Sequence, residues 1–284
     1  MSRLDPAWLD VQYDNRARVP DHPRIFEQWA RESAIARERS SRRLDIAYGD
    51  TPAETLDVFP SPRAGAPVLV FIHGGWWRAF DKRDHSFVAP AFTREGAMVV
   101  VPNYALAPSV TIETIALQTT RALAWTFRHA ALYGGDPRRI VVAGHSAGGH
   151  LTAMLLACRW PVVGADLPAD LLAGGLSISG VFDLEPLQQT PFLTDSLRLT
   201  PASARRLSPV RFPPPAAPLY AVAGALESEE FLRHNDLIRS AWGENAVPVC
   251  ESLPGANHFD VLDDFIDPHG RLHRLALQLL GLSA

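Results

Sequence analysis

The stretch A-G-H-S-A-G-G-H at residues 143–150 decides the fold. It contains a G-x-S-x-G pattern with Ser146 at its centre. The residues before it, R-I-V-V-A, are typical of a buried strand, and those after it, G-H-L-T-A-M-L-L-A, are typical of a helix. So tight a strand-to-helix turn strains the serine backbone and exposes its hydroxyl at the carboxyl end of a sheet. Ser146 is therefore the candidate nucleophile; His145 and His150 flank it too closely to act as its base.

Other short apolar runs have the composition of strands buried on both faces. They cover residues 66–73, 97–104, 139–146, 172–180, 218–225 and 247–255. Helix-like stretches separate several of them, at 112–134, 148–159, 230–243 and 270–281. Strands that alternate with helices indicate an α/β protein with a mostly parallel sheet flanked by helices. Before these runs, R-R-L-D-I-A-Y-G and E-T-L-D-V-F-P predict an opening antiparallel pair.

The chain has 284 residues, of which 47% are hydrophobic, and this size suits one large domain covering residues 1–284. Residues 1–42 are polar with helix-like spacing and predict an N-terminal helical arm that suggests no chemistry by itself. Residues 183–209 predict a small helical cap insertion over one end of the sheet. The Pro-rich run at 210–218 is a connection, because a strand pattern resumes at once.

Composition narrows the range of partners. The net charge is −4, and no basic stretch resembles a nucleic-acid footprint. No apolar run reaches the ~18 residues expected of a membrane span, and the acidic N-terminus lacks the apolar region of a signal peptide. We therefore expect a cytoplasmic protein that binds neither nucleic acid nor membrane. The sequence leaves the oligomeric state open, a homodimer included.

A serine hydroxyl is a weak nucleophile and needs a base oriented by an acid. In chains with this motif the order is serine, then Asp or Glu, then histidine. His258, in the loop after the last predicted strand, is the candidate base. Glu227 follows the preceding strand and is the candidate acid, whereas Glu229 and Glu230 lie at a helix start. Asp183, after the strand before that, is the alternative acid.

Acyl transfer also places negative charge on a carbonyl oxygen, which backbone N–H groups must stabilise. Ala147, the residue after the nucleophile, is one candidate donor. The motif F-I-H-G-G-W-W at 71–77 supplies two more, Gly74 and Gly75, whose N–H groups no Cβ obstructs. Trp76 stands at the fourth position of this HGGG-type motif, where many proteins have glycine. No His, Cys or carboxylate set has the spacing of a metal site, and this chemistry needs no cofactor.

Four stretches of the chain together resemble the α/β-hydrolase superfamily of serine hydrolases, on its hormone-sensitive-lipase side. They are H-G-G-W-W, N-Y-A-L-A-P at 103–108, G-H-S-A-G-G-H and G-A-N-H-F-D. More narrowly, the chain resembles the kynurenine formamidase (arylformamidase) group and its esterase relatives. F-D-K-R-D-H-S-F at 80–87, the N-terminal arm and S-G-V-F-D-L-E-P-L resemble that group too, so the resemblance covers nearly the whole chain. A glutamate at the acid position departs from the aspartate common in the superfamily.

This resemblance implies hydrolysis of N-formyl-L-kynurenine to formate and kynurenine, within tryptophan catabolism. Alternatives are a short-chain carboxylesterase or arylesterase of broad range, acting on small esters, and a non-catalytic binding protein with the same fold. The candidate substrate contacts are Trp76, Trp77, His73 and Tyr104, with only one of the two tryptophans expected to touch the substrate. Phe80 and His85 are weaker candidates. Lys82 and Arg83 are expected at the surface, where one could meet a substrate carboxylate.

Overall fold

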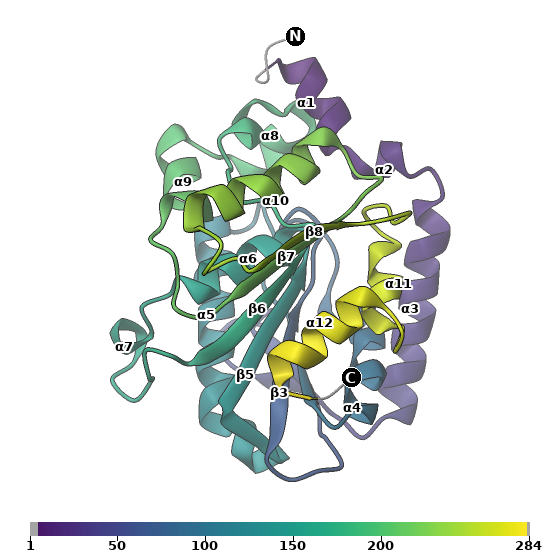
Figure 1. The fold of residues 1–284 in the computed structure, drawn as a ribbon, viewed down its shortest axis with the longest axis vertical. Helices are drawn as coiled ribbons and strands as arrows, with labels where there is room; N and C mark the ends of the chain where they lie inside the picture. Colours follow the sequence, from purple (N-terminus) through teal and green to yellow (C-terminus); the bar gives the residue numbers. More distant parts are fainter. Residues whose placement is uncertain (1–4, 283–284) are drawn as a thin grey trace.

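A computed structural model describes residues 5–282 and shows an eight-stranded sheet in the order β1-β2-β4-β3-β5-β6-β7-β8 (Figure 1). The strands from β4 through β8 in this order are parallel, while β1 and β2 are antiparallel to each other and β2 is antiparallel to β4. The strands are β1 (Arg43–Ala47), β2 (Thr55–Phe59), β3 (Ala66–Ile72), β4 (Met98–Pro102), β5 (Gly135–His145), β6 (Leu172–Ile178), β7 (Leu219–Gly224) and β8 (Val249–Leu253). Each predicted run is thus a strand, and the fold is the predicted mostly parallel α/β sheet.

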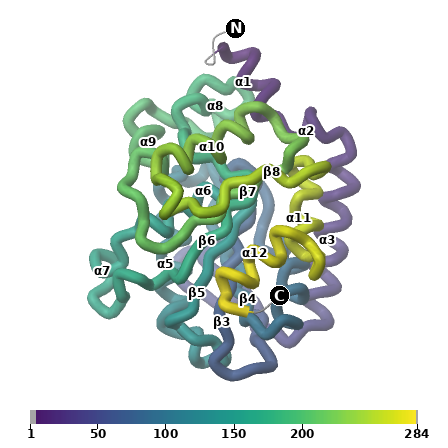
Figure 2. The backbone as a smooth tube through the Cα atoms, in the orientation of Figure 1, coloured from purple at the N-terminus to yellow at the C-terminus, as the bar shows by residue number. Residues whose placement is uncertain are grey.

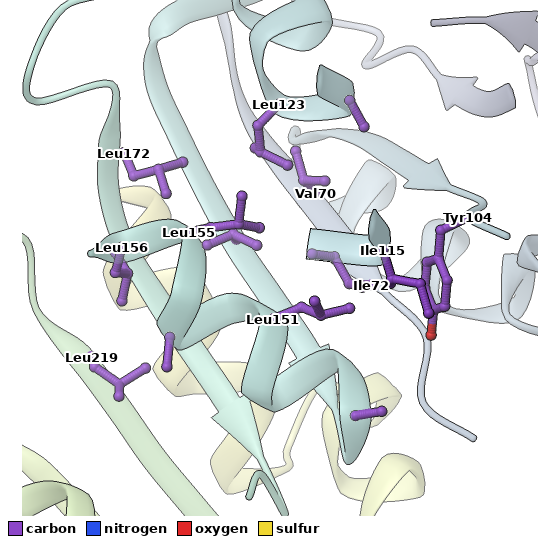
Figure 3. Close-up of a cluster of buried hydrophobic side chains, with 14 of the residues drawn as sticks. Val70, Ile72, Tyr104, Ile115, Leu123, Leu151, Leu155, Leu156, Leu172 and Leu219 are labelled. Atoms are coloured by element: carbon purple, nitrogen blue, oxygen red, sulfur yellow. The ribbon is translucent and has the colours of Figure 1, made fainter. Parts of the chain in front are cut away.

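Helices cover both faces of this sheet (Figure 1). Strand β3 shows how: Val70 and Ile72 belong to one hydrophobic cluster, whereas Leu69 and Phe71 belong to the other. Successive side chains of a strand point to opposite faces, so a continuous apolar run indicates burial on both. In Figure 3, Val70 is drawn next to Leu123, and Ile72 is drawn next to Leu151 of the helix that follows β5.

In the described part of the chain, seven helices accompany the strands from β3 onward, apart from those of the predicted cap segment. They are α4 (Ala89–Arg94), α5 (Ile112–His129), α6 (Ala147–Leu156), α7 (Trp160–Val163), α10 (Glu229–Trp242), α11 (Val261–Ile266) and α12 (Arg271–Leu280), with short 3₁₀ turns at η1 (Lys82–Asp84), η2 (Ser86–Val88) and η3 (Ala130–Tyr133). Four of them, α5, α6, α10 and α12, match the four predicted stretches. Within residues 5–282, no helix is both long and apolar enough to cross a membrane.

The N-terminal arm forms α1 (Pro6–Tyr13), α2 (Asn15–Arg18) and α3 (His22–Arg39), and residues 1–4 of the predicted arm lie outside the described part of the chain. Helix α1 contacts α8 and α10, far along the sequence (Figure 2). The Tyr13 hydroxyl donates to Glu230 Oε2 at 2.8 Å, and Asp10 accepts a hydrogen bond from the Phe192 N–H at 3.2 Å. The arm is therefore fixed by polar contacts to the end of the molecule above the strand termini.

The segment predicted as a cap insertion contains only short helices. They are η4 (Pro186–Gln189), α8 (Pro191–Leu197), α9 (Pro201–Arg206) and η5 (Pro209–Arg211). A proline at the first or second position begins each of them, where its fixed backbone angle is compatible with the first turn. Together with α1 and α10 they cover the carboxyl end of the sheet (Figure 1).

Candidate active site

Ser146 lies between the end of β5 and the start of α6, with φ 57° and ψ −117°. This left-handed conformation is costly for a residue with a side chain, and such strain gathers at functional sites. The helix after the serine lies so close to the sheet that a Cβ on Gly148 would be 2.0 Å from the carbonyl oxygen of Ile72. Only glycine fits at that position, which explains why the motif needs a small residue there.

The Ser146 hydroxyl is linked by hydrogen bonds to His258 and Glu227. Nε2 of His258 lies 3.1 Å from Ser146 Oγ, and Nδ1 lies 2.6 Å from Glu227 Oε2. All three side chains are buried. Because the carboxylate can only accept from Nδ1, Nε2 of the neutral ring is left to accept the serine proton. The structure thus brings the three predicted residues together in the order that a base-activated nucleophile requires.

Glu227, and not Asp183, is the carboxylate at the histidine. Its second oxygen, Oε1, accepts from Ser179 Oγ at 2.5 Å and from the Gly224 N–H at 2.6 Å. Asp183 accepts from the Glu185 N–H at 3.1 Å and forms no hydrogen bond with His258 among the described residues. Sequence reasoning missed Ser179, because a serine at the end of a strand carries no motif that marks it as a partner of the acid.

A second histidine, His145, holds the loop that carries His258. Nε2 of His145 lies 2.7 Å from the backbone carbonyl of His258 and donates to it. Burial holds the pKa of His145 well below its usual range, and neighbouring His258 lowers that pKa further. His145 is therefore a neutral donor at neutral pH, consistent with a supporting role and not with that of the base.

The predicted oxyanion loop lies against the nucleophile. A Cβ on Gly74 would be 2.7 Å from the carbonyl oxygen of His145 and 2.9 Å from Ser146 Cβ, so the loop reaches this position only with glycine. The N–H groups of Gly74, Gly75 and Ala147 donate to no backbone acceptor among the turn, loop and cap bonds of residues 5–282. Three unengaged donors near a serine hydroxyl are suited to stabilise an oxyanion.

His73 and Tyr104 support this loop from behind. Their rings stack with centroids 4.2 Å apart, His73 Nδ1 lies 2.9 Å from the Gly74 carbonyl, and the Tyr104 hydroxyl donates to the His73 carbonyl at 2.8 Å. Burial lowers the pKa of His73 and raises that of Tyr104, so both are neutral. Both are fully buried and do not line the cavity at Ser146. The structure therefore places them as loop supports, where a substrate contact was predicted.

A cavity of about 370 Å³ opens onto Ser146 and His258. Trp76 lines it, whereas Trp77 is fully buried and packs edge-on against His150 at 5.0 Å between ring centroids. Only one of the two tryptophans thus faces the cavity, and Trp77 is part of the core. The remaining lining residues are Asp14, Asn15, Arg16, Phe26, Trp29, Gly75, Arg78, Ala79, Phe80, His145, Phe192 and Phe259.

Several of these residues were missed by sequence reasoning, because they come from the arm and the cap, which carry no motif.

The prediction for Lys82, in the segment after the tryptophans, needs correction. Lys82 is buried and forms ion pairs with Asp45 at 2.5 Å and Asp57 at 2.6 Å, because the antiparallel pair β1–β2 places both carboxylates beside it. It is not a surface residue, and it does not line the cavity. Arg83 is exposed and does not line the cavity.

Among residues 5–282, no group of three or more His, Cys, Asp or Glu side chains is arranged to hold a metal ion.

Comparison with known proteins agrees with this fold. A family model described as the alpha/beta hydrolase fold matches residues 69–207. A bacterial crystal structure from Silicibacter sp. TM1040, provisionally assigned as a thioesterase, superimposes with a TM-score of 0.82, with 28% identity over 96% of this chain and 98% of that chain. The molecule is therefore an α/β-hydrolase-fold protein.

Its curated relatives are hydrolases. Kynurenine formamidase of Danio rerio is 26% identical over 257 residues, which is 87% of this chain and 85% of the relative. Esterase LipC of Mycobacterium tuberculosis is 34% identical over 140 residues, which is 48% of this chain and 35% of the relative. These similarities support a hydrolase with this fold.

Proposed function

We propose that this chain is a serine hydrolase that cleaves an aryl formamide through an acyl-enzyme, with N-formyl-L-kynurenine as the best candidate substrate. The observation that carries the proposal is the hydrogen-bonded chain Ser146–His258–Glu227 beside the bare N–H groups of Gly74 and Gly75. Similarity to kynurenine formamidases along most of the chain supports the choice of substrate.

The first half of the reaction forms a bond from Ser146 Oγ to the formyl carbon while His258 Nε2 takes the hydroxyl proton. The negative charge that develops on the formyl oxygen is met by the N–H groups of Gly74, Gly75 and Ala147. The carbon–nitrogen bond then breaks as His258 returns its proton to the leaving arylamine. Glu227 stabilises the transient imidazolium and fixes the ring tautomer.

In the second half, water adds to the formyl ester carbon and His258 takes the water proton. The tetrahedral intermediate releases Ser146 Oγ, which recovers a proton from His258, and formic acid leaves and ionises. The balance is one formamide and one water consumed, with one arylamine, one formate and one proton produced. No other reactant enters.

The cavity suits an aromatic leaving group. Trp76, Phe80 and Phe192 are among its walls, and Trp76 is itself fixed edge-on by Tyr13 of the arm at 5.7 Å between ring centroids. Aromatic pairs of this kind contribute about 0.5–1.5 kcal/mol beyond the burial of their area. A planar aryl group held between such walls would place its formamide carbonyl at the serine.

A second candidate function is a short-chain carboxylesterase, which the similarity to esterase LipC favours. The two are separated by kcat/KM of the purified protein for N-formyl-L-kynurenine and for p-nitrophenyl acetate. A formamidase prefers the formamide, although an amide bond is intrinsically the harder one to cleave. Higher kcat/KM for the acetate would support the esterase and overturn the proposed substrate.

A further inference from the structure

Two arginines lie in the lining of the cavity that contains Ser146. Arg78 follows the oxyanion motif, and its Nη1 donates to the Phe192 carbonyl at 2.8 Å and to Ser196 Oγ at 3.0 Å, both in the cap. Its guanidinium carbon lies 5.3 Å from the centroid of the Phe192 ring. Arg16 belongs to the arm, with its guanidinium carbon 5.6 Å from the centroid of Phe26. Both cations are thus held against aromatic walls of the cavity.

The positive charge of these arginines is only partly offset, by the carboxylate of Asp14, whose charge acts to raise the pKa of Arg78. Neither forms an ion pair with a carboxylate of residues 5–282. The pKa of Arg78 is lowered first by burial and then by the charge of Arg16, so each cation disfavours the other. A half-buried guanidinium whose hydrogen bonds go only to neutral acceptors retains the capacity to bind an anion.

A third donor in the same lining lacks a partner. Asn15 is almost fully buried, and its side-chain Nδ2 has no hydrogen-bond acceptor in the described chain. A buried amide without a partner destabilises the fold, so such a group usually has a ligand or water as its partner. Asn15 and Arg16 are adjacent at the start of α2, and Arg78 approaches the same cavity from the oxyanion loop.

We propose that Arg16 and Arg78, supported by Asn15, bind a free carboxylate on the leaving group of the substrate. This inference rests on the proposed function in one respect, because the position of Ser146 defines which part of the substrate is the leaving group. It adds the residues that recognise the α-carboxylate which N-formyl-L-kynurenine carries.

Asp14 narrows the ligand further. It lines the same cavity, and its carboxylate accepts from the Ala17 N–H at 3.1 Å as the cap of α2. A fixed negative charge beside two arginines disfavours a doubly charged phosphate, but it can pair with an ammonium group. An α-amino acid head group presents a carboxylate and an ammonium together. It therefore fits the part of the cavity lined by Asp14, Arg16 and Arg78 better than a simple anion does.

The test measures binding, so that it does not depend on turnover. Calorimetric titrations compare L-kynurenine with L-kynurenine amide, in which a neutral carboxamide replaces the carboxylate. The proteins are wild type, Arg78→Gln, Arg16→Gln and the control Arg83→Gln, an exposed arginine outside the cavity. Wild type should bind the carboxylate about tenfold or more tightly than the amide, since hydrogen bonds to charged groups contribute about 1.5–3 kcal/mol. Arg78→Gln and Arg16→Gln should each reduce that ratio, while Arg83→Gln should retain it.

Equal affinity of wild type for the two ligands, or binding of neither, overturns the inference. So does a ratio that persists in both cavity variants or is lost only in Arg83→Gln. The comparison of ligands on wild type needs no variant and stands even if a substitution unfolds the protein. Failure of the proposed function is a separate result. If the protein does not turn over N-formyl-L-kynurenine but still prefers the carboxylate ligand, the proposed function fails and this subsite stands. If it turns over that substrate without the preference, the proposed function stands and this subsite fails.

Discussion

Oε2 of Glu227 lies 2.6 Å from Nδ1 of His258, while Oε1 of the same carboxylate accepts from Ser179 and from the Gly224 backbone. Three donors therefore converge on one buried acid, which fixes the carboxylate and, through it, the ring of His258. Asp183, the other acid that follows a neighbouring strand, forms a local turn with Glu185 and lacks such a network.

We expect Glu227→Gln to lower kcat by about 10⁴-fold, because an amide in place of the acid favours the wrong histidine tautomer. Asp183→Asn should retain wild-type kcat. Steady-state kinetics of both variants on one substrate measures the difference. Survival of activity in Glu227→Gln with its loss in Asp183→Asn would mean that the acid is misassigned.

Ser179→Ala should lower kcat by about tenfold, because loss of one hydrogen bond to a charged, buried carboxylate costs about 1.5–3 kcal/mol. Ser177→Ala is the matched control: it lies on β6, is equally buried, and its hydroxyl has no partner among the described residues. The pH dependence of kcat/KM distinguishes positioning from packing, since only the former changes the apparent pKa of the base. Equal losses in both variants would show that Ser179 matters for packing alone.

Substitution of the two adjacent tryptophans should have different effects, on catalysis for Trp76 and on stability for Trp77. Trp76→Ala should lower kcat/KM for aryl substrates with a small effect on folding, because this ring lines the cavity. Trp77→Ala should lower the free energy of unfolding by about 3–5 kcal/mol, because it empties a fully buried core position. Kinetics and urea unfolding of both variants check this; an unchanged kcat/KM in Trp76→Ala would remove this residue from the substrate site.

Buried neutral histidines predict a loss of stability in mild acid. Burial lowers the pKa of His150 to about 4, and burial together with neighbouring His73 lowers that of His85 to about 3. In the unfolded chain a histidine has a pKa of about 6.5, so below that pH the unfolded state binds more protons than the folded state. Stability is therefore retained above about pH 6.5 and falls as the pH decreases towards the folded values, by up to about 1.4 kcal/mol per pH unit for each histidine.

Urea unfolding of wild type and His150→Gln between about pH 7 and pH 5 measures how steeply the free energy of unfolding changes with pH. The variant should reduce this slope by the equivalent of nearly one bound proton. An unchanged slope would show that His150 is not held neutral by burial. The comparison of slopes separates this effect from any constant loss of stability caused by the substitution.

The sequence predicted the sheet, because each strand buried on both faces has a continuous apolar run that is visible locally. It also predicted Ser146, Glu227 and His258, because each follows a strand whose carboxyl end lies at one edge of a parallel sheet. The oxyanion glycines were predictable for the same reason, since the loop after β3 lies beside the turn after β5.

The remaining site residues depend on contacts between segments that are distant in sequence. Arg16 and Arg78 share a cavity only because the arm docks over the cap, which no local pattern encodes. Lys82 was expected at the surface because its neighbours are charged, but Asp57 is fully buried beside it.

The central claim is that Ser146 is a nucleophile activated by His258, and covalent labelling tests it most directly. The folded protein is treated with a fluorophosphonate, and the modified residue is located by peptide mass spectrometry. We predict one stoichiometric adduct on Ser146, absent in Ser146→Ala and formed far more slowly in His258→Ala. Absence of an adduct on folded wild-type protein, or an adduct on another residue with Ser146 unmodified, would contradict the account.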